Sequence, residues 1–365
     1  MSKILKITQV VYPGYGGSGA VSFSISSGLK KIENIEIITS FIFIGNALLC
    51  KDYQTKCLKN NFSYLYIKNK FFKFISFYKI YYFLKKTKPD VIINHDNFIL
   101  PFLLYCFFNN CKFIFVFHFP FFFNYKLIIN FFYSLITADR VILVSKRKDF
   151  LNFLSKYIKK IQIIENGIDP NLFKKKYVKK TFFTIGMACR FVRQKKPNLL
   201  IDVVKKYKIF FLEKKIKISF VGVGPDLFKL KSTVKKNNLS EIINFKGYLN
   251  EIQMANWLNH LSIFVNLSDF ETTPTTILQA FAIPIPVIAS DIPGHQEISK
   301  RSYRNIPSLL LVKNDIDKIF NKIFYLYQNQ KQLDRYKVSA KFYSKKIYND
   351  KFMAKKYLNM IKKIK

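Results

Sequence analysis

Short runs of apolar and β-branched residues alternate with longer amphipathic stretches through the first half of the chain. The runs cover residues 4–11, 35–43, 91–94, 113–117, 141–144 and 161–164. This alternation is typical of strands joined by crossover helices, because each helix returns the chain to begin the next parallel strand. It predicts a parallel sheet covered by helices.

A second series of the same kind begins at residue 182. Its apolar runs cover residues 182–186, 216–221, 242–245, 263–266, 286–289 and 309–312. The pattern therefore predicts an α/β protein with two doubly wound, Rossmann-like domains. A length of 365 residues agrees with two hydrophobic cores rather than one.

A basic, poorly periodic stretch at residues 174–180 marks the boundary between the two domains, since it follows an N-G-I-D-P turn. We predict a first domain over residues 1–177 and a second over residues 178–342. The last segment, 343–365, has an amphipathic helical pattern, and we expect it to pack back on the first domain.

The apolar stretch 98–123 comes nearest to a membrane span, but polar residues such as Asn109, Lys112 and His118 interrupt it. We interpret it as a helix, a turn and a buried strand. The chain starts directly on a strand pattern, and its five cysteines form neither a C-x-x-C pair nor an even set for disulfides. These features indicate a reducing cytoplasm.

The charge is strongly basic, with 61 Lys and Arg against 22 Asp and Glu, which gives +39. Such a charge attracts nucleic acid, anionic membranes and phosphorylated substrates alike. A base-composition bias in the gene explains much of it equally well, because Lys, Ile, Asn, Phe and Tyr all have A/T-rich codons. The charge alone therefore identifies no partner.

Ligands of open α/β sheets bind beyond the carboxyl ends of the strands, and three clusters follow predicted strands. The first is the glycine-rich run 13–19, where Gly16 and Gly17 let backbone N–H groups approach an anion closely at the start of a helix. It matches neither the G-x-G-x-x-G nor the P-loop spacing, so a simple tight turn is the alternative.

The second cluster, residues 186–196, follows the first strand of the second domain. The planar fork of Arg190 and the point charge of Lys195 suit a pyrophosphate group. In a chain so rich in Lys, a solvated basic loop is the alternative.

The third cluster spans residues 268–298. Glu271 lies in a loop after a strand, Pro274 and Thr275 open a helix, and Gln279 lies on its first turns. The start of that helix offers backbone N–H groups to a phosphate.

This third cluster resembles the nucleotide-sugar signature of the retaining glycosyltransferases of family 4, which have the GT-B fold, with two Rossmann-like domains facing a cleft. That family has two glutamates separated by seven residues, whereas this chain has Glu271 and then Gln279. Pro284 and Lys196 also stand where the family usually has glycine.

Further matches extend the resemblance over nearly the whole chain. They are N-G-I-D at 166–169, G-V-G-P at 222–225, K-P-D-V-I at 88–92, the pair Gly16–Gly17, and His118. Each motif alone is weak, but their order and spacing together are specific.

The resemblance implies a role for each matching residue. The donor diphosphate would be held by Arg190, Lys195, Gly16, Gly17 and Thr275. The catalytic residues would be Glu271 and His118. The ribose and the nucleotide would be contacted by Gln279 and Gly224. An amide at position 279 can donate and accept a hydrogen bond but lacks the charge of a carboxylate.

The histidines need separate treatment. Apart from the family, a lone His118 at the end of an apolar strand is more typical of a satisfied core residue. His95 and Asp96, at the preceding strand exit, are secondary candidates for the acceptor side. We interpret His260 and His295 as surface or local structural residues.

The resemblance also implies a nucleotide-sugar donor, UDP- or GDP-linked, and no cofactor. We identify neither an Asp-x-Asp motif nor a cluster of His and Cys ligands, so we expect no metal. Basic residues would then replace a divalent ion at the leaving diphosphate.

Residues 68–86 mix aromatic side chains with Lys on a predicted helix of the first domain. Such a helix can lie in the headgroup region of an anionic membrane, and an ordinary helix packed on the sheet is the alternative. The membrane interpretation leads us to expect a lipid-linked oligosaccharide acceptor. The protein would then be cytoplasmic and peripheral on the inner face of the cell membrane, in assembly of O-antigen, capsule or lipopolysaccharide.

Two other functions fit parts of the sequence. A nucleotide-sugar epimerase shares the architecture but needs carboxylates that deprotonate the sugar, and no clear set is present. A basic RNA- or membrane-binding protein on a degenerate transferase scaffold is favoured by the net charge and by Gln279. We expect no nucleic acid among the partners.

Overall fold

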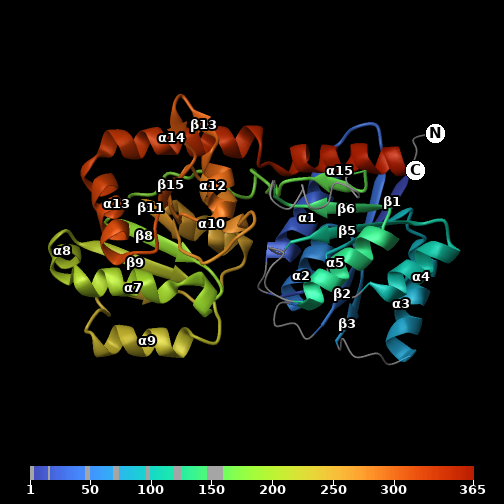
Figure 1. Cartoon of the computed structure of the whole chain (residues 1–365), viewed down its shortest axis with the longest axis horizontal. Coiled ribbons are helices and arrows are strands. Elements are labelled where there is room, and N and C mark those ends of the chain that lie inside the picture. Colours follow the sequence, from blue (N-terminus) through green and yellow to red (C-terminus); the bar gives the residue numbers. More distant parts are fainter. Residues whose placement is uncertain are drawn as a thin grey trace. The chain divides into compact units, whose positions relative to one another are not determined.

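The computed structural model describes residues 4–14, 17–45, 50–68, 74–95, 99–118, 125–145 and 159–365. The chain forms two compact units (Figure 1). Unit 1 comprises Met1–Asp169 and Asp350–Lys365, and unit 2 comprises Pro170–Asn349. Each unit has one parallel sheet with helices, which confirms the prediction of two doubly wound α/β domains.

The sheet of unit 1 has the strand order β3-β2-β1-β4-β5-β6-β7, and every pair of neighbours is parallel. The strands are β1 (Leu5–Val11), β2 (Ile37–Ile44), β3 (Ser63–Ile67), β4 (Val91–Asn94), β5 (Lys112–Phe117), β6 (Arg140–Leu143) and β7 (Ile161–Ile163). The order reverses between β1 and β4, so this is the position at which such sheets bind ligands.

Strand β3 was absent from the prediction. Its sequence S-Y-L-Y-I alternates, but it lies at the edge of the sheet and only Ile67 is fully buried. An edge strand covered on one side only has a weaker apolar pattern than a central one. The other strands of unit 1 lie within three residues of their predicted bounds.

Helices cover both faces of this sheet. The helices of unit 1 are α1 (Gly17–Lys30), α2 (Cys50–Lys59), α3 (Phe74–Thr87), α4 (Leu100–Phe108), α5 (Tyr125–Thr137) and α15 (Asp350–Ile364). Helices α1 and α15 share one core with the central strands, whereas α3, α4 and α5 share the core of the opposite face.

Helix α15 packs directly on α1 (Figure 1). A Cβ atom on Gly28 of α1 would lie 2.3 Å from the carbonyl oxygen of Asp350, so the close approach requires glycine. Met353, Tyr357 and Ile361 of α15 are buried in the core of unit 1. The helix begins at residue 350 rather than at 343.

The predicted linker belongs to unit 2 instead of lying between the domains. Phe173 is buried, Asn259 donates a hydrogen bond to the carbonyl of Lys174 (3.1 Å), and the backbone N–H of Lys176 donates to Asn259 (2.8 Å). These contacts move the boundary from residue 177 to residue 169. The Lys-rich composition had suggested a solvated connection.

The sheet of unit 2 has the parallel order β10-β9-β8-β11-β12-β15. The strands are β8 (Phe183–Ala188), β9 (Ile216–Val221), β10 (Ile243–Phe245), β11 (Ile263–Asn266), β12 (Val287–Ser290) and β15 (Leu310–Val312), with a small hairpin of β13 (Ser302–Tyr303) and β14 (Ile306–Pro307). The order reverses between β8 and β11.

Helices also lie on both sides of the sheet of unit 2. They are α7 (Pro197–Lys206), α8 (Lys208–Glu213), α9 (Leu227–Lys236), α10 (Glu251–Asn259), α11 (Thr275–Ala282), α12 (Pro293–Ser299), α13 (Ile316–Gln328) and α14 (Gln330–Lys346). Helices α7, α8, α9 and α13 close the main core over one face of the sheet. The loops that follow the parallel neighbours β8 and β11 both lie at the carboxyl ends of the strands.

Candidate active site

The loops that follow β8 and β11 meet at the switch point of unit 2. The two strands pair in parallel, with Ile263 opposite Ile185, so the loops that follow them leave the sheet at the same edge. The β8 loop carries Arg190 and Lys195, and the β11 loop carries Glu271. The structure thus gathers three of the predicted residues where a ligand of this fold would bind.

Lys195 and Glu271 form an ion pair in which Nζ of Lys195 donates to Oε1 of Glu271. The side chains are only 21% and 11% exposed, respectively. Lys195 ends a short 3₁₀ helix, Arg193–Lys195, which turns its side chain back toward the β11 loop. The predicted phosphate-binding cation and the predicted catalytic carboxylate are therefore in direct contact.

Backbone and side-chain bonds join the two loops to each other. The carbonyl of Gln194 accepts from the backbone N–H of Asp269 (2.9 Å) and from the hydroxyl of Ser268 (3.1 Å). The Gln194 amide donates to the carbonyl of Phe270 (3.1 Å), and Lys196 pairs with Asp269 at 2.7 Å. These contacts hold the Lys195–Glu271 pair in place, as an electrostatic site requires.

Arg190 projects from the β8 loop, and it is exposed. Its guanidinium makes no ion pair or hydrogen bond within the part of the chain that the structure describes. The backbone beneath it rests on the G-V-G-P turn, where Phe191 N–H donates to Val223 (2.9 Å). A Cβ on Gly224 would lie 2.3 Å from the Phe191 carbonyl oxygen, so Gly224 permits this close approach.

Helix α11 starts beside the β11 loop. Its N-cap residue is Pro274, and no side chain caps it. Thr275 is its first residue, and Gln279, which is buried, follows four positions later on the same face. At the end of β11, the Asn266 amide donates to Thr276 (3.3 Å), while its Oδ1 has no partner among the described residues.

His295 is fully buried, so of the two interpretations given for it, a surface residue or a local structural residue, the first is wrong. Its Nδ1–H donates to the carbonyl of Ser290 (2.8 Å), and its Nε2 has no partner among the described residues. Burial lowers the pKa of His295. The negative charge of Glu271 opposes this shift, and the positive charge of Lys195 adds to it. A Cβ on the preceding Gly294 would lie 2.0 Å from the Glu271 carbonyl oxygen, which explains this proximity.

In unit 1, two buried polar side chains and one half-buried histidine form a hydrogen-bonded chain at the switch point. Gln9 comes from β1, His95 follows β4, and His118 follows β5. The Oε1 of Gln9 lies 2.8 Å from Nε2 of His95, and Nδ1 of His95 lies 2.8 Å from Nε2 of His118. The sequence analysis named both histidines as candidates but not Gln9. The signal that could have identified Gln9 is its long polar side chain within the otherwise apolar strand I-T-Q-V-V.

The donor and the acceptor of each hydrogen bond in this chain of side chains can be assigned by starting from Ser26. The hydroxyl of Ser26 donates to the carbonyl of Ser22 (3.0 Å), so its oxygen accepts from the amide of Gln9 (3.5 Å). Oε1 of Gln9 then accepts from His95, and Nδ1 of neutral His95 accepts from Nε2–H of His118. With the Gln9 amide in this orientation, His118 donates from Nε2–H to His95.

Both imidazoles are neutral at physiological pH. Burial lowers the pKa of His118 to about 4. Burial also holds the pKa of His95 well below its ordinary value, and the neighbouring His118 adds to this effect. An imidazole in this state offers no positive charge to a phosphate.

The remaining predicted residues divide into two groups. Gly17 is exposed at the first position of α1. His260 is an exposed residue at the end of α10, and its ring Nδ1 lies 2.9 Å from the carbonyl oxygen of Asn256. Gly16 and Asp96 lie outside the described residues.

Acidic and metal-ligating residues show no metal centre in the described ranges. No three His, Cys, Asp or Glu side chains there lie close enough to hold an ion. The prediction that no Asp-x-Asp motif is present is wrong, because Asp315 and Asp317 form one. Asp315 caps α13, however, and Asp317 pairs with Lys206 at 2.5 Å. Among the described helices, none has both the length and the apolar character needed to cross a membrane.

Two family profiles match adjoining parts of the chain. Glycosyl transferases group 1 matches residues 169–342, and Glycosyltransferase Family 4 matches residues 58–172. Together they include the loops of both switch points described above, apart from those of β1.

Two similar curated proteins come from Escherichia coli. The O-antigen biosynthesis glycosyltransferase WclY is 28% identical over 236 residues, which are 61% of this chain and 61% of that protein, so the match spans less than two thirds of its length. The UDP-Gal:alpha-D-GlcNAc-diphosphoundecaprenol alpha-1,3-galactosyltransferase is 28% identical over 180 residues, which are 45% and 44% of the two chains.

A solved structure of similar fold is that of Anabaena Alr3699/HepE in complex with UDP and glucose. The superposition covers 98% of this chain and 100% of that chain, with a TM-score of 0.78. The sequences are 14% identical, so this likeness concerns the fold.

Proposed function

Because this chain belongs to the glycosyl transferases of group 1 and has the GT-B fold of family 4, we propose that it transfers a sugar from a nucleotide diphosphate-sugar with retention of configuration. The contact between Lys195 and Glu271 at the switch point of unit 2 carries the proposal. It places a cation and a carboxylate side by side, and the two charges that develop in such a transfer need one of each.

Departure of a nucleotide diphosphate builds negative charge on the phosphate and positive charge on the sugar. Arg190, Lys195 and the start of α11 at Thr275 would stabilise the first charge, and Glu271 the second. Lys195 would exchange its bond to Glu271 for one to the phosphate. Gln279 would hydrogen-bond the ribose, and these steps require no metal or other cofactor.

The donor would carry UDP or GDP. UDP is favoured by the fold of the Anabaena protein, whose structure contains UDP and glucose. His118 would meet the sugar from unit 1. Because the lowered pKa keeps its ring neutral, His118 suits a sugar hydroxyl better than a charged phosphate.

The acceptor would be a lipid-linked glycan at the inner face of the cell membrane, in assembly of a bacterial surface polysaccharide. The two Escherichia coli relatives support this, because their names give O-antigen biosynthesis for one and a diphosphoundecaprenol-linked acceptor for the other. The basic charge of the chain suits an anionic surface.

The test is a thermal-shift screen of the full chain against UDP, GDP, ADP and CMP and their common sugar conjugates. A ligand that binds only the folded state raises the unfolding midpoint. We expect a clear shift with UDP or GDP that is lost in Arg190→Ala. If folded protein shows no shift with any nucleotide, the degenerate scaffold that binds only membranes or RNA replaces this proposal.

A further inference from the structure

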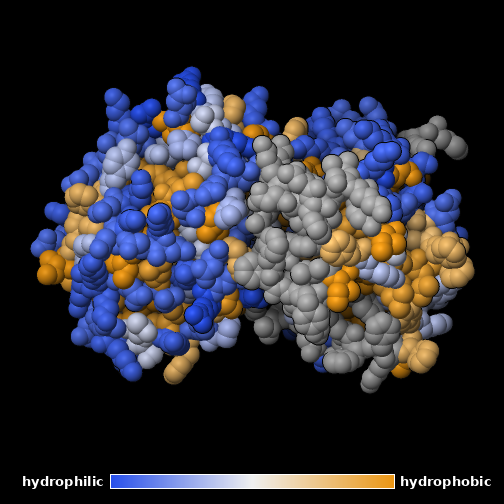
Figure 2. Space-filling view, in the orientation of Figure 1, coloured by the Kyte–Doolittle hydropathy of each residue, from blue (hydrophilic) through white to orange (hydrophobic). Residues whose placement is uncertain are grey.

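Helices α3 and α4 of unit 1 expose an unusual number of large apolar side chains. We call them the aromatic face: Phe74, Ile75, Tyr78, Tyr81 and Tyr82 from α3, with Leu100, Leu104, Phe107 and Phe108 from α4. Phe74 is 96% exposed and Phe107 is 83% exposed. The two helices pack on each other, and Figure 2 shows hydrophobic residues gathered over this part of unit 1.

The charges around this face all have one sign. Lys79, Lys85 and Lys86 lie on α3, and neither α3 nor α4 contains an acidic residue. Tyrosine and lysine side chains have an apolar body and a polar tip, which suits a boundary between water and hydrocarbon. Scattered exposed apolar residues are ordinary, but a contiguous group of this kind marks an interaction surface.

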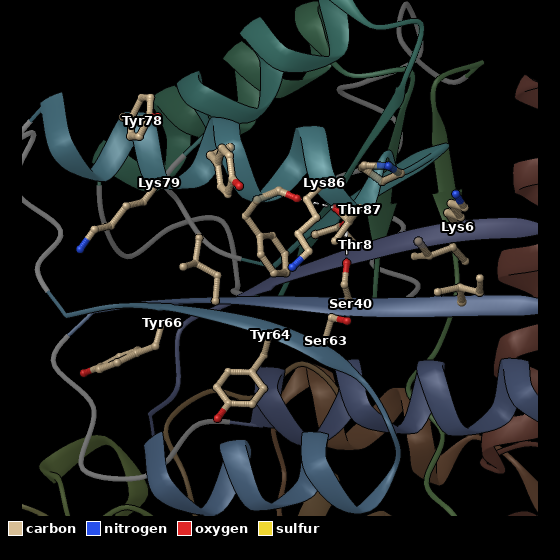
Figure 3. Close-up of a pocket in the computed structure, with 16 residues that line it drawn as sticks. Lys6, Thr8, Ser40, Ser63, Tyr64, Tyr66, Tyr78, Lys79, Lys86 and Thr87 are labelled. Carbon is tan, nitrogen blue, oxygen red and sulfur yellow. Dashed lines mark hydrogen bonds between the residues drawn. The ribbon is translucent and has the colours of Figure 1, made fainter.

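A pocket of about 730 Å³ lies between α3 and the sheet, next to this face. Lys79 and Lys86 from α3 line it, with the hydroxyl residues Thr8, Ser40 and Ser63 from the strands (Figure 3). The Thr8 and Ser40 hydroxyls are hydrogen-bonded to each other at 2.8 Å. Ammonium and hydroxyl groups together are the donors that a phosphate group requires.

The pocket and the aromatic face are continuous. Tyr78 and Tyr82 line the pocket and also belong to the exposed face, and their rings stack with centroids 6.3 Å apart. Figure 3 shows the ammonium of Lys86 directed toward Thr8 and Ser40, whereas that of Lys79 points away from them. An amphiphile could therefore place its phosphate beside Lys86 and its hydrocarbon beside the tyrosines.

We propose that the aromatic face of α3 and α4 lies in the surface of an anionic membrane, and that the adjoining pocket binds the phosphate headgroup of a lipid there. This inference deepens the proposed function, on which it rests for the view that the acceptor is presented at a membrane. It concerns a part of unit 1 that shares no residue with the site of Gln9, His95 and His118.

Two other occupants fit less well. A second copy of the chain would bring the same lysines against one another, at a net charge of +39 on each partner. A nucleic acid would satisfy the lysines, but it offers nothing to fully exposed Phe74 and Phe107, because stacking platforms for bases lie in basic grooves.

The test is co-sedimentation of the full chain with vesicles of phosphatidylcholine alone or mixed with phosphatidylglycerol. Phe107→Ser/Phe108→Ser tests the aromatic face, and Lys79→Gln/Lys86→Gln tests the pocket. Matched controls come from α9 of unit 2, where Phe228 is 85% exposed and Lys229 and Lys231 are also exposed. They are Phe228→Ser and Lys229→Gln/Lys231→Gln.

We expect binding to the anionic vesicles that weakens at least tenfold in Phe107→Ser/Phe108→Ser. Lys79→Gln/Lys86→Gln should lose the preference for phosphatidylglycerol, and both controls should bind as the parent does. Equal binding by parent and test variants, or equal losses in the controls, would overturn the inference in favour of diffuse charge attraction.

The nucleotide thermal shift of each variant keeps the two proposals apart. All four variants should keep the shift of the parent, because none of the changed residues is among those assigned to the donor site. A parent without any nucleotide shift contradicts the proposed donor but not the membrane surface, which the vesicle experiment decides by itself.

Discussion

Nε2 of His118 lies 2.8 Å from Nδ1 of His95, and this bond joins the exits of β5 and β4. It is the last step of a relay that begins at a backbone carbonyl of α1. The buried interior of unit 1 thereby fixes the tautomer of the one histidine that the family resemblance places at the donor sugar.

His95→Leu removes the hydrogen-bond acceptor of His118 and so one of the contacts that orient its ring. We expect kcat to fall at least tenfold with a small change in KM for the donor, because in the proposed function His95 positions His118 and does not bind the nucleotide itself. Steady-state kinetics measure this, and His95→Asn, which keeps an acceptor, should recover part of the rate. An unchanged kcat in His95→Leu would remove the relay from the mechanism.

The buried histidines make the folded state less stable in acid. The pKa of His118 is lowered to about 4 in the folded protein, against about 6.5 unfolded, so the unfolded chain binds more protons between these values. Stability is full above about pH 6.5 and falls as the pH approaches 4, by at most ~1.4 kcal/mol per pH unit for each proton. Urea unfolding at several pH values measures the slope.

The control for this pH dependence is His118→Asn. Carboxylates titrate in the same range in both proteins, so the difference between the two slopes isolates the histidine. Identical slopes would contradict the depressed pKa of His118.

Glu271→Gln separates binding from chemistry. Loss of the carboxylate charge frees Lys195 for the diphosphate, so we expect UDP affinity to be retained or increased while transfer falls by at least ~10². Arg190→Ala should lower both the affinity for UDP and the rate of transfer. Calorimetric titration with UDP, beside a transfer assay, gives the two values, and a strong loss of UDP binding in Glu271→Gln would contradict the assigned roles.

Gln279→Glu restores the second carboxylate of the family pattern. We expect donor binding to be retained or improved, since a carboxylate accepts from both ribose hydroxyls. Titration with the nucleotide-sugar measures the affinity. Gln279→Ala is the matched control, because alanine makes no hydrogen bond to either ribose hydroxyl. Inactive Gln279→Glu together with fully active Glu271→Ala would disprove the site.

Pro284→Gly should stabilise unit 2. Pro284 has a φ of 26°, whereas the proline ring holds φ near about −65° and glycine adopts positive values readily. Release of this strain, of order 1 kcal/mol, should raise the midpoint of thermal unfolding by a few degrees. Calorimetry of parent and variant decides the matter, and a lower midpoint would contradict the strain.

The central strands were predictable because strands buried on both faces read as continuous apolar runs. Lys195 and Glu271 were predictable as candidates because both follow such strands. Their mutual contact was not, because it depends on how two loops 76 positions apart in sequence pack. Gln9 and His295 were missed for a related reason: single polar residues acquire meaning only when the buried partners around them are known.

The contact of α15 with α1 has a consequence for biosynthesis. Unit 1 needs helix α15, Asp350–Ile364, to cover its core, whereas unit 2 is one continuous segment that ends at residue 349. The sheet of unit 1 therefore keeps an apolar surface uncovered until the whole of unit 2 has been made. The order of folding runs against the order of synthesis, and a nascent chain stalled before α15 would be a substrate for chaperones and proteases.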